Sequence, residues 1–523
     1  MTLGNQIPDE GRTLHRANAT TMFWLMLLAF AAALSLFLLL QRLGLHAEII
    51  VGSILFMTVT VVVGLAFTSR TMTGSQFFYA NRTLGPFTSG LSSSSDILSG
   101  AMLVLLFSSS LAGKMLLATS LALGILFQAG MFSSAFQRSG VSGLPGYFAW
   151  RFQNQITGYL ALIAVFGMLL LLSLAEMQVA KNILQIQTGI PLDNAVWFVL
   201  VLAVLPSLFG GWTGLLLVNA TLVIWMLVCT LVPAIATGFF ASMFGQSLQL
   251  DFLGEPLNAL DLAPSTLLFG SSETVSVAAP VFTVLAIAAG ISTLPQALSR
   301  LSTNNRAVDA IESVGWLALM VFLMLSALPL SLGLVVATPT SAKLASVLQA
   351  QPVLHMLPYF IVLFAAINAL AATLFTAASS VSRATGRFRN LNPGEQSVFS
   401  TRLVILILAG LLLYWPDAWT PPTDHLLISA LMLGTGGLFI PLLISTWLGS
   451  ISAWAVSLSI ACGTATTLLL LAPVKLLFTL SPITAGITGA AVALIVLIAD
   501  RLWSKLRGSW PKLNSSAQYL RRH

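Results

Sequence analysis

The chain has 523 residues, of which 57% are hydrophobic and only 7% are charged. Soluble domains carry about 25% charged residues, so this composition excludes a water-soluble enzyme, because too little charge remains to cover its surface. The net charge of +7 comes from 23 Lys and Arg against 16 Asp and Glu. The two cysteines lie in apolar runs and the five histidines are scattered, so neither a disulfide framework nor a metal site is indicated. The composition predicts a polytopic membrane protein.

Apolar stretches long enough to cross a bilayer recur along the whole chain. A hydrocarbon core of about 30 Å needs roughly 20 apolar residues in a helix. Fourteen stretches meet this criterion, at about 19–41, 47–68, 87–111, 114–136, 156–187, 193–209, 215–243, 275–298, 312–336, 354–382, 402–415, 425–446, 451–472 and 480–500. The first is too long and too late for a typical cleaved signal peptide, so it is predicted to be a helix.

The basic residues orient these spans. If the N-terminus is cytoplasmic, 18 of the 23 Lys and Arg fall inside, including Arg151, Arg300 and the six of the tail 501–523. The outside receives only Arg42, Lys114, Lys181, Lys343 and Lys475, and the longest outer loop, 244–274, has four acidic residues and no basic one. The positive-inside rule therefore predicts a multi-pass protein of a bacterial inner membrane with both termini cytoplasmic. The basic tail is interpreted as a lipid-facing anchor, not a nucleic-acid arm.

Catalytic motifs are missing from the sequence. It contains no HExxH, no Gly-rich phosphate loop before a Lys and no nucleophile elbow. The Gly and Ser clusters lie within apolar spans, where small residues permit close helix packing. We therefore expect no enzyme activity and no cofactor.

The third span, 87–111, is unusually polar. Four consecutive serines, Ser92–Ser95, precede Asp96, and Ser99 and Gly100 follow. A carboxylate at mid-membrane is costly and normally faces a cavity or a partner. Ser and Gly suit an unwound stretch that exposes backbone groups to ions or anionic solutes. The pattern favours a broken helix; the alternative is that the serines bond to their own helix and Asp96 lies near the cytoplasmic interface.

The tenth span carries hydroxyls in helical spacing. Residues 369, 373, 376 and 380 share one face, which places Thr373, Thr376 and Ser380 together, and Asn368 lies beside this face. A small, hydroxylated face suits ion binding and tight helix packing equally well, and the residues alone leave both open.

Four segments in order resemble the sodium/solute symporter family. Phe78–Gly85 resembles the cytoplasmic signature before its first core helix, and Ser94–Gly100 resembles the Asp-containing break in that helix. Gly143–Phe152 is similar to a family loop, and Gly290–Gln296 resembles the Gly-Thr-x-x-Leu-Pro-His motif of the monocarboxylate, acetate-permease-like branch. No single segment is strong, but their order holds over about residues 48–400.

The resemblance implies an all-α, LeuT-like five-plus-five inverted repeat with about four extra helices. The implied organisation is a cytoplasmic segment 1–18, two peripheral helices in 19–68, a first repeat 87–243, an extracytoplasmic loop 244–274, a second repeat 275–446, two peripheral helices in 451–500 and the basic cytoplasmic tail 501–523.

The resemblance also implies where ions bind. The third and tenth spans become core helices one and eight, which in the family form the sodium site. The implied ion-coupling residues are Ser95, Asp96, Leu98, Ser99, Ala366, Ala369, Leu370 and Thr373, with sodium expected at Ser95, Leu98, Ala366 and Thr373. Ala369 and Leu370 stand where the family has a hydroxyl pair, and Asn219 where it has an aspartate, so the set is degenerate. Coupling to sodium or to a proton both remain open.

The branch resemblance favours a small monocarboxylate such as acetate or pyruvate. A carboxylate would suit the exposed N–H groups at the start of a half-helix, and no membrane-embedded Arg is expected to hold it. The predicted substrate cavity comprises Ser93, Ser94, Glu176, Gln178, Asn219, Thr293, Gln296 and Asn368. The predicted activity is symport of this solute in membrane lipid, with a small membrane or cytoplasmic subunit as a further partner. A transporter-like sensor or accessory subunit and a proline-type amino-acid symporter are the alternatives.

Overall fold

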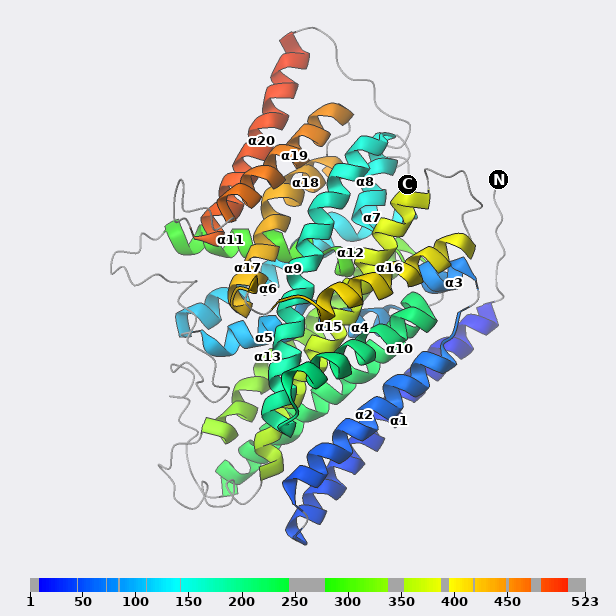
Figure 1. Cartoon of the computed structure of the whole chain (residues 1–523), viewed down its shortest axis with the longest axis vertical. Coiled ribbons are helices and arrows are strands. Elements are labelled where there is room, and N and C mark those ends of the chain that lie inside the picture. The colour runs from blue at the N-terminus through cyan, green and yellow to red at the C-terminus, as the bar shows by residue number, and fades with distance from the viewer. Residues whose placement is uncertain are drawn as a thin grey trace.

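The computed structural model describes residues 9–44, 46–71, 73–82, 85–109, 111–141, 143–243, 278–336, 352–386, 395–416, 419–447, 451–471 and 481–506 (Figure 1). The expected outer loop 244–274 lies outside these residues, as do Lys343, Arg387, Arg389, Lys475 and the tail beyond residue 506.

Every element within the described ranges is helical. In chain order these are α1 (Asp9–Arg42), α2 (Ala47–Thr68), α3 (Gly74–Tyr79), η1 (Ala80–Arg82), α4 (Pro86–Ile97), α5 (Gly100–Ser108), α6 (Leu111–Phe127), η2 (Gln128–Phe132), α7 (Ser133–Ser139), α8 (Leu144–Phe152), α9 (Gln155–Thr188), α10 (Leu192–Met243), α11 (Ala278–Ser292), α12 (Pro295–Leu301), α13 (Ala307–Val336), α15 (Pro352–Gly386), α16 (Glu395–Leu413), α17 (Thr423–Leu433), η7 (Gly434–Phe439), α18 (Ile440–Trp447), α19 (Ala453–Leu471) and α20 (Pro482–Leu506). The prediction of an all-α membrane protein is confirmed.

The number of spans depends on how bent helices are counted. Among the described residues, ten helices are long and apolar enough to cross a membrane, and twelve if two bent pairs each count as one span. The fourteen expected stretches exceed this number for two reasons. The stretches 193–209 and 215–243 fall in the single element α10, and α16 offers only a short apolar stretch, Ser397–Leu413.

A sharp turn divides α10. Gly211 has φ 56° and ψ −138°, outside helical values, and a Cβ on Gly214 would lie 2.7 Å from the carbonyl oxygen of Pro206. In a straight helix residues eight apart are separated by about 12 Å along the axis, so the chain must bend strongly here. The two expected stretches are therefore two helical arms joined without a loop.

The core of the bundle is centred on α15. Every residue of this helix from Phe360 to Ser379 is buried, and α15 packs against α9, α10 and both halves of the broken helix α4–α5. Figure 1 shows α1 and α2 beside α10 along one side and α19 and α20 on the far side. The helices that carry the candidate site are thus enclosed by others.

Candidate functional site

The polar third span is a broken helix. α4 and α5 are bent by 52° at Leu98 and Ser99, and Ser99 caps the second half by accepting from the Met102 N–H at 3.3 Å. The first half begins at Pro86, whose fixed φ and missing N–H suit the first turn of a helix. The expected break is therefore confirmed.

The serines before the break nevertheless bond to their own helix. Ser93 donates to the Ser89 carbonyl and Ser94 to the Leu91 carbonyl, both at 2.7 Å, and Ser95 donates to the Ser92 carbonyl at 2.9 Å. All three side chains are buried. The break and the local serine bonding, which were opposed as alternatives, occur together.

A second break lies in the span 275–298. α11 and α12 are bent by 50°, with Thr293 and Leu294 between them. Thr293 donates to its own helix and its hydroxyl oxygen lies against Gly434 of η7. Gln296, in the first turn of α12, is buried, and its Oε1 has no hydrogen-bond partner. The two breaks supply the half-helix ends that transporters use to bind ions and solutes.

The first break contacts α15 at Ala366, one of the predicted ion-coupling residues. A Cβ on Gly100 would lie 2.5 Å from the Cβ of Ala366, so the start of α5 and α15 approach closely. Beyond Ala366, the side chains of Ala369 and Leu370 are buried and offer no oxygen. Thr373 donates to the Leu370 carbonyl and accepts from Ser173 of α9, both at 2.9 Å. Packing therefore accounts for much of this hydroxylated face.

Substituting Gly100 tests this contact. Gly100→Ala is expected to lower the free energy of unfolding by about 1–3 kcal/mol, because the added methyl overpacks the crossing. Thermal unfolding of the purified protein measures the change. Gly64→Ala on α2 is the matched control, since nothing lies within 4 Å of its new Cβ. A Gly100→Ala variant as stable as the control would contradict the close approach.

Asp96 is paired with a buried arginine. Arg300 Nε lies 2.5 Å from Asp96 Oδ2, and both side chains have 0% exposure. Arg300 Nη2 also donates to Asp96 Oδ1 at 2.9 Å. The sequence prediction that Arg300 lies in a loop is wrong, because it lies in the helix α12 and its side chain is fully buried. The bend at Thr293 is the reason, because it redirects α12 toward α4.

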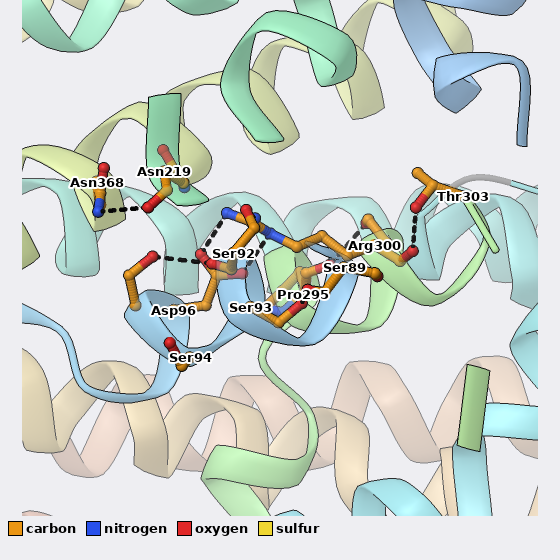
Figure 2. A network of polar contacts seen from close by, with 12 residues as sticks. Ser89, Ser92, Ser93, Ser94, Asp96, Asn219, Pro295, Arg300, Thr303 and Asn368 are labelled. Carbon is orange, nitrogen blue, oxygen red and sulfur yellow. Dashed lines mark hydrogen bonds and ion pairs between the residues drawn. The ribbon is translucent and has the colours of Figure 1, made fainter. Parts of the chain in front are cut away.

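Arg300 is the centre of a polar network, and Figure 2 shows its side chain beside Asp96 and Ser92, with Asn219 and Asn368 near them. Its Nη1 donates to Ser92 Oγ, which lies one turn before Asp96 on α4. With its amide oxygen facing Arg300, Asn219 accepts from Nη2 at 2.6 Å and donates to Asn368 Oδ1 at 3.0 Å. The guanidinium also lies 5.2 Å from the centre of the Trp212 ring. The network unites α4, α10, α12 and α15.

Glu176 occupies a different position from Asp96. It lies on α9 with 0% exposure, and its Oε2 accepts from the Ala101 N–H at 3.2 Å. Ser99 and the backbone of Gly100 adjoin the same carboxylate. The sequence analysis expected the start of a half-helix to suit a solute carboxylate, and the start of α5 holds a side-chain carboxylate of the protein itself.

Gln178 lies apart from the other predicted cavity residues. Its amide donates to the Pro421 carbonyl at 3.3 Å and accepts from Thr423 at 3.1 Å. It lines a separate cavity of about 400 Å³ together with Lys181, Asp193, Trp197 and Trp415. The structure does not bring Gln178 to the breaks.

The predicted sodium ligands are only partly suited to a cation. The hydroxyls of Ser95 and Thr373 donate within their own helices and keep lone pairs that could face a cation, whereas Leu98 and Ala366 can offer only their backbone carbonyls. Within the described residues no cluster of three His, Cys, Asp or Glu is present. Of the predicted residues, Asp96, Asn219 and Asn368 meet in one network, whereas Ser99, Ala366 and Glu176 meet around the start of α5. Sequence reasoning missed Ser92, Trp212 and Arg300.

Comparisons with known proteins agree with this architecture. Residues 77–381, more than half of the chain, match the family model described as "Sodium:solute symporter family". A solved structure of a Na⁺-coupled sialic acid symporter in a substrate-bound outward-open state has a TM-score of 0.64 and 14% identity over 87% of this chain and 97% of that one. A structure of Mhp1, a nucleobase-cation-symport-1 family transporter, has a TM-score of 0.49 and 15% identity over 86% of this chain and 98% of that one. A search of curated protein sequences found no match. The fold is LeuT-like.

Proposed function

Because the chain belongs to the sodium:solute symporter family, we propose that it is a secondary active transporter that moves a small organic solute by alternating access. The family is one of sodium-coupled transporters, not of enzymes. The observation that carries the proposal is the pair of broken helices, α4–α5 and α11–α12, around the buried ion pair of Asp96 and Arg300. Transporters place discontinuous helices at the solute and ion sites.

The proposed solute is a monocarboxylate such as acetate or pyruvate. The segment that resembles the monocarboxylate branch, Gly290–Gln296, lies at the second break. The Glu176 side chain already occupies the start of α5, and the Arg300 guanidinium is occupied by Asp96, Ser92 and Asn219. Gln296, buried with an amide oxygen that lacks a partner, is therefore the proposed polar contact, because an amide can turn its NH₂ toward a carboxylate.

The orientation and partners follow the sequence argument. The basic loops support cytoplasmic termini, and a bacterial inner membrane is the proposed location. Sodium is the coupling ion typical of the family, and a proton is the alternative, because Ala369 and Leu370 offer no side-chain oxygen. A small membrane or cytoplasmic subunit remains a proposed partner.

Solute uptake into proteoliposomes tests the proposed function. Sodium and proton gradients are imposed in separate experiments. We expect a radiolabelled monocarboxylate to accumulate several-fold with an inward gradient of the coupling ion, and not without a gradient. Gln296→Ala should raise the KM for uptake by about tenfold, the loss typical of one buried polar contact. Accumulation of proline instead would favour the amino-acid alternative. Specific binding without flux would overturn the transporter and favour a sensor.

A further inference from the structure

The charges around the first break do not balance. Asp96 and Glu176 are both fully buried acids, and Arg300 is the one buried base beside them among the described residues. Arg300 gives its Nε and Nη2 to Asp96, so that carboxylate already has its cation. The described surroundings of the break are therefore one positive charge short.

Glu176 is the carboxylate without a counter-charge. Its Oε2 accepts the Ala101 N–H, and Ser99 and the Gly100 backbone adjoin the same carboxylate, so within the described part of the chain it is surrounded by neutral donors and by no cation. A buried carboxylate without a cation is costly in a membrane protein, and such groups mark ion or proton pathways. The partial positive charge at the start of α5 compensates only part of a full negative charge.

The other charged groups of α9, α10, α15 and α17 do not fill this role. α5 has no titratable residue. Lys181 follows Glu176 by five positions on α9, which places it about 7.5 Å along the axis and about 140° around it, and it lines the separate cavity. Asp424 and His425 lie in the first turn of α17, at the end where Thr423 contacts Gln178. Asp193, near the start of α10, lines the same cavity as Lys181, and Arg383 of α15 lies over the ring of Phe78.

Hydroxyl oxygens lie near the Glu176 carboxylate. Ser99 caps α5 beside the Glu176 carboxylate. Ser173, one turn before Glu176 on α9 and so on the same face, bonds Thr373 of α15 at 2.9 Å. A hard cation prefers such oxygen ligands. This cluster lies on α5, α9 and α15, next to the contact of Gly100 with Ala366.

We propose that the Glu176 carboxylate binds the monovalent coupling cation, whereas Arg300 permanently neutralises Asp96 and keeps it out of ion binding. The inference rests on the proposed symport function and names its ion site. Glu176 supplies carboxylate oxygens in place of the neutral hydroxyls that are missing at Ala369 and Leu370. One cation, sodium or a proton, balances the charge of the site.

Cation binding by the purified full-length protein tests the proposal without any solute. Binding of ²²Na⁺ is measured by scintillation proximity at alkaline pH, and the carbonyl stretch of a protonated carboxyl is followed by infrared spectroscopy during a pH titration. If sodium is the ion, Glu176→Gln weakens ²²Na⁺ binding by about tenfold or more. If a proton is the ion, sodium does not bind, and Glu176→Gln abolishes a titrating carboxyl band. Either result supports the site at Glu176.

Two further variants keep the test decisive. Asp500→Asn removes one carboxylate from the peripheral helix α20, where Asp500 accepts from Ser452 at 3.1 Å, and should leave both readouts unchanged. Glu176→Asp keeps the charge and should retain binding with weaker affinity, even if Glu176→Gln folds poorly. Sodium binding or a carboxyl band that Glu176→Gln leaves unchanged would overturn the proposal, as would the absence of both from the wild type. Failure of solute uptake alone would instead count against the proposed function.

Discussion

Replacing Arg300 with glutamine is expected to lower the free energy of unfolding by roughly 3–5 kcal/mol, the cost typical of removing one partner of a buried ion pair. Both side chains are completely buried, so solvent cannot compensate the Asp96 carboxylate that remains. The loss also leaves Ser92 and Asn219 without the guanidinium that bonds them. Thermal unfolding of the purified protein, followed by size-exclusion chromatography, measures the change.

The double variant separates charge pairing from general disruption. Asp96→Asn added to Arg300→Gln removes both charges, and exchanging a buried ion pair for neutral groups costs far less than breaking it. We expect the double variant to be more stable than either single variant, so the coupling energy in the double-mutant cycle exceeds the loss caused by either single substitution. Losses that simply add would show that Asp96 and Arg300 do not depend on each other.

The general fold was predictable because membrane helices follow from apolar length. The first break was predicted, since Ser and Gly in Ser92–Gly100 depart from the usual apolar pattern, whereas the second, before Pro295, was not. The two apolar stretches on either side of Gly211 were identified correctly, but the sequence did not show that they form the single element α10 with a sharp turn.

The position of Arg300 could not be read from the sequence. It follows the second break by a few residues, and in a straight span it would emerge at the cytoplasmic surface, where arginine is common. The 50° bend places it instead against α4. The sequence did contain one signal. Ser92 and Asp96 lie one turn apart, so two polar groups share one helical face, and this pattern predicts a buried hydrogen-bond donor opposite them.

The prediction that Glu176 and Gln178 line the same cavity could have been excluded by helical geometry alone. Residues two apart on a helix point about 200° from each other, so both side chains cannot face one cavity. Glu176 reaches the start of α5, whereas Gln178 bonds Pro421 and Thr423. The sequence correctly selected both as polar exceptions but could not assign a face to each.

Gly211 to alanine is the second large effect that we expect, with a loss of roughly 3–5 kcal/mol in the free energy of unfolding. The backbone there, at φ 56° and ψ −138°, is accessible essentially to glycine alone. A Cβ would also lie 2.4 Å from the carbonyl oxygen of Phe77 in α3, so backbone strain and overpacking add.

The consequence reaches the site because Trp212 follows directly. The turn at Gly211 sets the Trp212 ring 5.2 Å from the Arg300 guanidinium and starts the arm that carries Asn219. Gly315→Ala on α13 is the matched control, since its Cβ would meet nothing within 4 Å and alanine favours a helix by about 0.5–1 kcal/mol over glycine. Unfolding midpoints should therefore fall for Gly211→Ala and hold or rise for Gly315→Ala. Equal midpoints would mean that α10 does not need this turn to place Trp212 and Asn219 around Arg300.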